Sequence, residues 1–151
     1  MLSVMALEDV IIQEDFEYTY PRKTKLDKIR NYICKNRKLD KPIKVYENVL
    51  IDGYTRYLVA QEYEFEHIPC EIVNVFYVSG RLWNSNREYT WKVVDNSVIE
   101  VGDRVMVESD SYYDKKTKQR CVLTEIVTVT NVFTSDDMNM LRYKSIIKKV
   151  E

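Results

Sequence analysis

Apolar residues in the first half of the chain recur with helical spacing in one segment. Leu26, Ile29 and Ile33 stand three and four residues apart, which places them on one side of a helix that begins near Thr24. Thr24 and Asp27 resemble a capping box, in which side chains bond the free N–H groups at a helix start. The pattern therefore predicts a helix from Thr24 onward.

Short apolar or alternating segments on both sides of this helix predict strands. These segments are residues 10–12, 42–46, 49–51 and 67–73. Residues 54–63 again have helical spacing and predict a second helix. Because Pro69 has no N–H to donate, the strand over residues 67–73 is expected at an edge of its sheet.

The second half of the chain favours strands, because it is rich in β-branched residues and has no long helical period. Strands are predicted at residues 91–94, 104–107, 122–132 and 146–147, turns at Asp95-Asn96, 102–103 and 110–118, and one helical turn at 135–141. Several closely spaced short strands indicate a small, mostly-β domain, either an SH3-like barrel or a curled sheet.

A polar, turn-rich segment centred near residue 85 separates the two patterns. Asn84-Ser85-Asn86-Arg87 follows Leu82-Trp83, and such a composition indicates a boundary or linker. The predicted domains are residues 1–82 and residues 88–151. The predicted fold class is therefore α+β, with a mixed first domain and a mostly-β second domain.

Composition narrows the class of protein. Of the 151 residues, 45% are hydrophobic and 31% are charged, as in ordinary globular proteins. The apolar runs are too short to span a membrane, and the N-terminus lacks the basic region of a signal peptide. Three distant cysteines without a CxxC pair, and a single histidine, argue against a zinc site and for reduced thiols. These features predict a cytoplasmic protein.

The net charge of the chain is only −1, but its basic residues are concentrated in one block. Residues 22–41 hold nine bases and two acids, a balance that attracts nucleotides or nucleic acid. A solvated helix face explains the same pattern equally well. A second basic segment, residues 115–120, is expected in a hairpin loop, where it either touches phosphates or is a solvated turn.

The segment with the clearest chemistry is Asp52-Gly53-Tyr54-Thr55-Arg56, between a predicted strand and a predicted helix. A helix N-terminus presents unpaired N–H groups and the positive end of the helix dipole, so it binds anions. Gly53 permits close backbone approach to a phosphate, Thr55 offers a hydroxyl, and Arg56 offers a bidentate fork. Taken alone, the segment also fits an ordinary tight turn with a surface arginine.

Five landmarks in order resemble the ParB/sulfiredoxin superfamily. They are Pro21-Arg22, the helix over Leu26 to Ile33, Pro42-Ile43-Lys44-Val45, Ile51-Asp52-Gly53-Tyr54-Thr55-Arg56-Tyr57 and Ile68-Pro69. The resemblance covers roughly residues 5–75. It implies a ParB/sulfiredoxin-like fold with a phosphate pocket at Gly53, Thr55 and Arg56, to which Arg22 and Lys23 contribute.

The superfamily uses this pocket for different functions. Partition proteins bind CTP and DNA, sulfiredoxins repair peroxiredoxins with ATP, and other members phosphorylate small molecules. Tyr54 and Thr55 occupy the positions of the sulfiredoxin Cys and His, so the nucleophile is missing and sulfiredoxin activity is excluded. The β-rich second half also differs from the helix-turn-helix domain that follows the motif in partition proteins.

Three functions stay open. The leading hypothesis is a nucleotide- or nucleic-acid-binding protein. The alternatives are a protein-interaction module with a degenerate pocket, and a small kinase or nucleotidase using ATP or CTP with Mg²⁺. An enzyme needs a carboxylate as general base, for which Asp52 and Glu14 are candidates. Asp52 equally fits a role in capping the turn, and Glu14 fits a solvated acidic turn. The sequence does not predict the oligomeric state.

Overall fold

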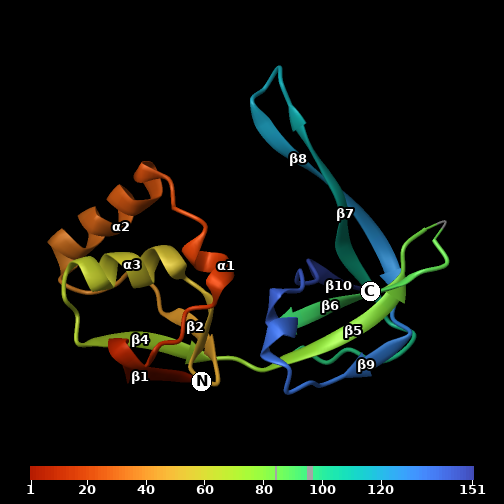
Figure 1. Cartoon of the computed structure of the whole chain (residues 1–151), viewed down its shortest axis with the longest axis horizontal. Helices are drawn as coiled ribbons and strands as arrows, with labels where there is room; N and C mark the ends of the chain where they lie inside the picture. The colour runs from red at the N-terminus through yellow and green to blue at the C-terminus, as the bar shows by residue number, and fades with distance from the viewer. Residues whose placement is uncertain (84, 95–96) are drawn as a thin grey trace. The chain divides into compact units, whose positions relative to one another are not determined.

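The computed structural model describes residues 1–83, 85–94 and 97–151. The chain forms two compact units, Met1–Val73 and Asn74–Glu151 (Figure 1). The first unit mixes helices with strands and the second consists mostly of strands, so the predicted α+β class is confirmed. The domain limits 1–82 and 88–151 stay a prediction, and the two compact units meet between Val73 and Asn74.

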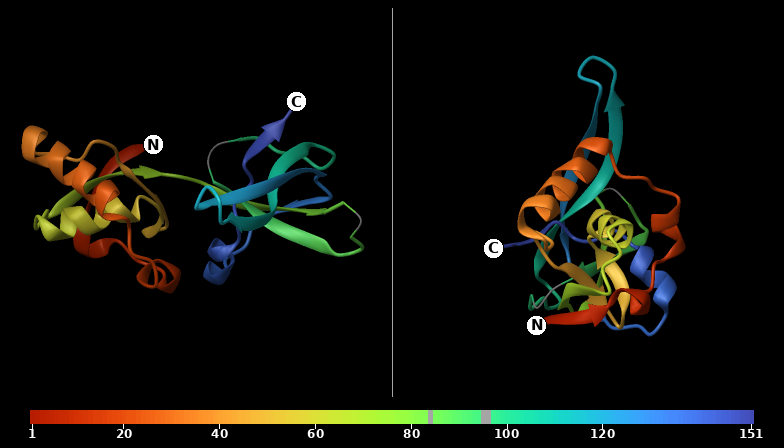
Figure 2. Two further views of the ribbon diagram at one scale, coloured as in Figure 1. Left: turned by 90° about the horizontal axis from the view of Figure 1, so that it is seen from above. Right: turned by 90° about the vertical axis from the view of Figure 1, so that its left-hand side faces the viewer.

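The first unit is a four-stranded sheet with two helices on one of its faces (Figures 1 and 2). Its elements are β1 (Leu2–Ala6), the 3₁₀ turn η1 (Leu7–Asp9), α1 (Glu14–Glu17), α2 (Lys23–Asn36), β2 (Ile43–Tyr46), β3 (Val49–Asp52), α3 (Tyr54–Glu62) and β4 (His67–Ile72). The strand order is β1-β4-β2-β3, in which β4 runs antiparallel to β1 and parallel to β2.

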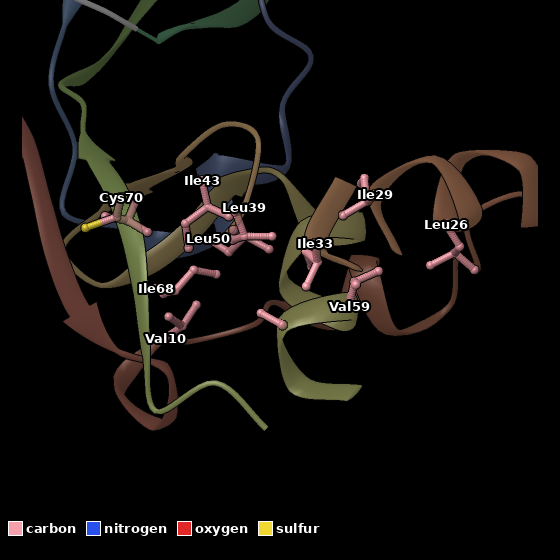
Figure 3. Packing of buried hydrophobic residues seen from close by; sticks show 12 residues of the cluster. Val10, Leu26, Ile29, Ile33, Leu39, Ile43, Leu50, Val59, Ile68 and Cys70 are labelled. Atoms are coloured by element: carbon pink, nitrogen blue, oxygen red, sulfur yellow. The ribbon is translucent and has the colours of Figure 1, made fainter. Parts of the chain in front are cut away.

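The core of this unit lies between the sheet and the two helices (Figure 3). Along β2, Ile43 and Val45 are buried whereas Lys44 and Tyr46 are half-buried, the alternation expected of a strand with one covered face. The predicted helical stripe of α2 is buried, with Leu26, Ile29 and Ile33 at most 5% exposed. The sheet and helices therefore cover each other through the periodicity visible in the sequence.

Two sequence predictions about this sheet were wrong. β4 is an inner strand, not an edge strand. Pro69 is tolerated there because the ladder between β4 and β2 begins only at Cys70. The strand predicted at residues 10–12 is reduced to a single bridge between Ile11 and Val49, because the chain turns into α1 directly afterwards. β1 was also not predicted from the sequence. Its Leu2 and Val4 are exposed, so apolar residues do not mark the buried face of this strand.

The start of α2 also differs from the prediction. The N-cap residue is Arg22, and its side chain makes no capping hydrogen bond. Asp27 is not part of a capping box, because its carboxylate pairs with Arg30 at 3.1 Å. The helix ends at Asn36 with Arg37 in the left-handed conformation.

The second unit contains two three-stranded sheets in the described residues rather than one closed barrel. Its elements are β5 (Val75–Arg81), β6 (Glu88–Val94), β7 (Arg104–Asp114), β8 (Gln119–Thr128), β9 (Asn131–Phe133), the 3₁₀ helix η2 (Met138–Arg142) and β10 (Lys148–Val150). The sheet orders are β6-β5-β9 and β10-β7-β8. Buried valines from both sheets share one core with Trp91. A side chain on Gly80 would meet Val127, so the two sheets approach closely at that point.

Several boundaries in the second unit depart from the prediction. β7 continues to Asp114 where a turn was expected, and the last strand begins at Lys148 rather than residue 146. The polar segment near residue 85 joins β5 to β6, which pair along their whole length. Asn84 of that segment and the predicted turn Asp95-Asn96 lie outside the described residues.

Candidate functional site

A sharp turn joins β3 to α3 at Gly53. Its φ of 104° lies in the left-handed region, which glycine enters at little cost. A Cβ at this position would also stand 2.8 Å from the Ile43 side chain. The sequence therefore needs glycine here for both its backbone angle and its close packing.

A cleft of about 250 Å³ opens beside this turn. It is lined by Phe16, Thr19, Tyr20, Pro21, Lys25, Asp52, Gly53, Tyr54, Thr55 and Arg56. α1 lies beside the N-terminal end of α3 (Figure 1), where the rings of Phe16 and Tyr54 are 5.2 Å apart. The cleft thus forms where the segment after α1, the first turn of α2 and the start of α3 meet.

Arg56 makes a bidentate ion pair within the protein. Its Nε and Nη2 donate to the two carboxylate oxygens of Asp40 at 2.9 and 3.0 Å, and both side chains are 22% exposed. The hydrogen bonds from Arg56 hold the pKa of Asp40 below its usual value. They also raise the pKa of Arg56, to which the charge of Asp52 contributes. Asp40 therefore holds the Arg56 side chain in place and accepts hydrogen bonds from part of its guanidinium group.

The structure brings four of the predicted residues together around the cleft, namely Asp52, Gly53, Thr55 and Arg56. Thr55 is buried, at 4% exposed. Three others do not line it. Arg22 and Lys23 are exposed at the start of α2, and Glu14 lies in α1, where it accepts a hydrogen bond from the Tyr18 hydroxyl at 3.0 Å.

Lys25 lines the cleft but was not predicted from the sequence. Its side chain is exposed and lines the cleft from the first turn of α2. Lys25 stands four positions before the buried Ile29, so both lie along the same side of the helix. That spacing was the available signal, whereas the family resemblance implied Arg22 and Lys23.

Aromatic side chains at the cleft fall into two groups. The Tyr54 ring packs against Phe16 and stacks on Tyr57 with centroids 6.3 Å apart. Tyr20, in contrast, is 80% exposed and lines the cleft. An exposed ring of this kind can stack on a nucleobase.

Asp52 is the carboxylate most relevant to a divalent cation. It is exposed and lines the cleft. Mg²⁺ bound with a nucleotide takes one or two carboxylates besides phosphate oxygens and water, so Asp52 fits that group. Within residues 1–83, 85–94 and 97–151, no cluster of three or more His, Cys, Asp or Glu side chains is arranged to hold a metal.

The helices in the described part of the chain are also too short or too polar to cross a membrane.

Structural comparison finds proteins of the two kinds that the sequence resembles. A Pnob8-like ParB-N domain is 20% identical, with a TM-score of 0.42 over 48% of this chain and 29% of its own. A truncated chromosome-partitioning ParB from Caulobacter crescentus complexed with CTP-γ-S is 18% identical, with a TM-score of 0.39 over 48% and 43%. Sulfiredoxin from Arabidopsis thaliana is 21% identical, with a TM-score of 0.41 over 48% and 83%.

These similarities concern the fold alone. They are similarities to a ParB-N domain and to a sulfiredoxin, the two kinds of protein that the sequence resemblance names. The match spans less than half the length of the two ParB proteins. No family model matches the sequence, and no curated protein does.

Proposed function

We propose that the β3–α3 turn binds the phosphate groups of a nucleotide or nucleic acid. The observation that carries this proposal is the cleft of about 250 Å³ in which a glycine turn, a helix start and two cationic side chains meet. The first N–H groups of α3 and the positive end of its dipole favour an anion. Lys25 and Arg56 supply the compensating charge.

A nucleotide suits the cleft better than free phosphate. The exposed Tyr20 ring offers a stacking surface for a base, and Asp52 offers a carboxylate for Mg²⁺ on the phosphates. ATP and CTP are therefore the first ligands to test. Asp52 is also the carboxylate to test if nucleotide turnover is found, since Glu14 does not line the cleft. A cytoplasmic location, predicted from the sequence, belongs to the same proposal.

A protein-interaction module is the second candidate. The observation that favours it is the bidentate pair between Arg56 and Asp40, because a guanidinium held by a carboxylate has fewer N–H groups to offer a phosphate. In this alternative the cleft is degenerate, and partner binding does not depend on anions.

Thermal-shift titration with ATP, CTP, GTP and a short DNA duplex, with and without Mg²⁺, tests the proposal. A ligand that binds only the folded protein stabilises it by about 2.7 kcal/mol at one hundred times its Kd. The informative variants are Lys25→Gln and Arg56→Ala. Lys25→Gln is the cleaner of the two because it removes a cleft charge without breaking the Arg56–Asp40 pair.

Arg30→Ala is the matched control. Arg30 forms a bidentate pair with Glu62 at 2.8 and 2.9 Å but does not line the cleft. We expect the ligand-induced shift to shrink in both cleft variants and to persist in the control. A flat response to every ligand at millimolar concentration would reject the nucleotide-binding proposal and favour the interaction module.

A further inference from the structure

A two-stranded ribbon projects from the second unit (Figures 1 and 2). We define the arm as residues 110–123, the outer part of β7 and β8 with the turn between them. β10, the other strand paired with β7, reaches only as far as Met106. A register shift between Glu108 and Asp110 then precedes five further pairs, from Asp110↔Leu123 to Asp114↔Gln119. Within the described residues, the strands of the arm therefore pair only with each other.

Both faces of the arm expose aromatic and aliphatic side chains. Opposite residues in a ladder share a face, so the register places Tyr113 with Arg120 and Ser111 with Val122 on one face. Tyr112 lies on the other face. Tyr112 and Tyr113 are 54% and 62% exposed. Antiparallel strands commonly pack one face against the core and leave a polar face in solvent. This arm instead exposes apolar side chains on both faces.

The end of the arm is basic. Residues 110–123 contain the bases Lys115, Lys116, Lys118 and Arg120 and the acids Asp110 and Asp114. Arg120 is tied to the base of the arm, since its Nη2 donates to Glu108 at 2.6 Å. The three lysines are exposed in the turn between β7 and β8. Positive charge is thus concentrated at the outermost point of the ribbon.

We propose that the arm inserts into the major groove of double-stranded DNA. A flat partner would cover only one face of a ribbon, whereas a groove surrounds both faces together with the tip. The lysines match the charge of the phosphates on the groove walls, and the tyrosine hydroxyls can donate to phosphate oxygens. The aliphatic side chains of the arm can contact thymine methyl groups. This surface is separate from the cleft at Arg56 and does not depend on the function proposed for that cleft.

The dimensions agree with this occupant. Five residue pairs extend about 17 Å at roughly 3.4 Å per residue, and two paired strands lie about 4.8 Å apart. The major groove of B-DNA is about 12 Å wide and about 8.5 Å deep, enough for a two-stranded ribbon. The arm is therefore long enough to reach the floor of the groove.

Fluorescence anisotropy with a labelled 20-base-pair duplex, measured over a series of salt concentrations, tests the proposal. The test variant is Lys115→Gln/Lys116→Gln/Lys118→Gln. If each lysine contacts a phosphate, the slope of log K against log salt should fall in magnitude by about 2.7, or about 0.9 per lysine. The matched control replaces the same three lysines with arginine, keeps the charge, and should retain both the slope and the affinity.

The possible outcomes separate this proposal from that for the cleft. Weaker binding with a reduced slope in the glutamine variant, together with preserved binding in Lys25→Gln, supports the arm. An unchanged slope in the glutamine variant overturns it, as does wild-type protein that fails to bind duplex at 50 mM salt. Equal or tighter binding to a single strand of the same sequence also overturns insertion into a groove. Unaltered thermal unfolding of the glutamine variant shows that the exposed lysines were removed without loss of fold.

Discussion

Replacing Asp40 with asparagine should strengthen nucleotide binding while weakening the fold. Arg56 holds the Asp40 carboxylate through two hydrogen bonds, and a phosphate that takes the same N–H groups must displace it. Asp40→Asn keeps the shape of the side chain but removes the charge that competes with the ligand. We therefore expect the variant to bind CTP more tightly than the wild type does.

The size of the effect follows from the burial of the pair. Exposed ion pairs contribute about 0.2–1 kcal/mol, and breaking a fully buried pair costs about 3–5 kcal/mol. At 22% exposure for both side chains, this pair lies between those limits, and about 1.5 kcal/mol is a reasonable value. Since about 1.4 kcal/mol corresponds to a tenfold change, the Kd for CTP should fall roughly tenfold. The free energy of unfolding should fall by about 1–2 kcal/mol.

The same pair makes stability depend on acid pH. Because Arg56 lowers the pKa of Asp40 in the folded protein, the pair stabilises the fold fully above the unfolded-state pKa of about 3.9. This contribution is lost as pH falls through the lower pKa of the folded state. Urea unfolding from pH 7 to pH 2 should therefore show the wild type and Asp40→Asn converging at the acid end.

Isothermal titration calorimetry with CTP provides the affinity measurement, with Asp27→Asn as the control. Asp27 pairs with Arg30 on α2, so this control removes an equivalent charge away from the cleft. It should leave the Kd unchanged. If folded Asp40→Asn bound CTP no more tightly than the control, competition between Asp40 and the ligand for Arg56 would be refuted.

Three further predictions concern the closely packed residues Gly80, Leu50 and Gly53, and each is measured by urea unfolding. Gly80→Ala should destabilise the protein by about 1–3 kcal/mol, because the new Cβ would overlap the Val127 side chain; an unchanged midpoint would contradict the close approach of the two sheets. Leu50→Ala should cost about 2–5 kcal/mol, since Leu50 is fully buried, and a loss below 1 kcal/mol would argue against this core. Gly53→Ala should cost at least 1 kcal/mol, on the order of the penalty for a left-handed non-glycine residue, and should also weaken CTP binding. If Gly53→Ala kept both the stability and the CTP affinity of the wild type, the turn would tolerate a side chain.

The features that the sequence predicted are those encoded locally. The strand–turn–helix at Gly53 was found because the glycine and the helical spacing after it lie within a few residues of one another. The buried side of α2 was found for the same reason, since Leu26, Ile29 and Ile33 mark it by period alone. Both are decided by neighbours along the chain.

The features that the sequence did not predict depend on contacts between distant residues. Asp40 is 16 positions from Arg56, and no local pattern indicates that the two side chains pair. The inner position of β4 depends on β1, a strand more than sixty residues earlier in the chain. The sequence predicts a turn at residues 110–118, where β7 continues to Asp114, because the alternation that marks a one-sided strand is absent from the arm.

The pairing of β1 with β4 also constrains the order in which the chain folds during synthesis. Met5 pairs with Ile68, 63 positions later, and a ribosome adding roughly 5–20 residues per second needs about 3–13 s to make that stretch. β1 therefore leaves the ribosome seconds before its partner exists and must wait unpaired while α2 and α3 form. β7 and β8 pair within a few positions of their turn, so the arm can close almost as soon as it is made. β1, the earliest strand of its sheet along the chain, is thus among the last parts of that sheet to be fixed.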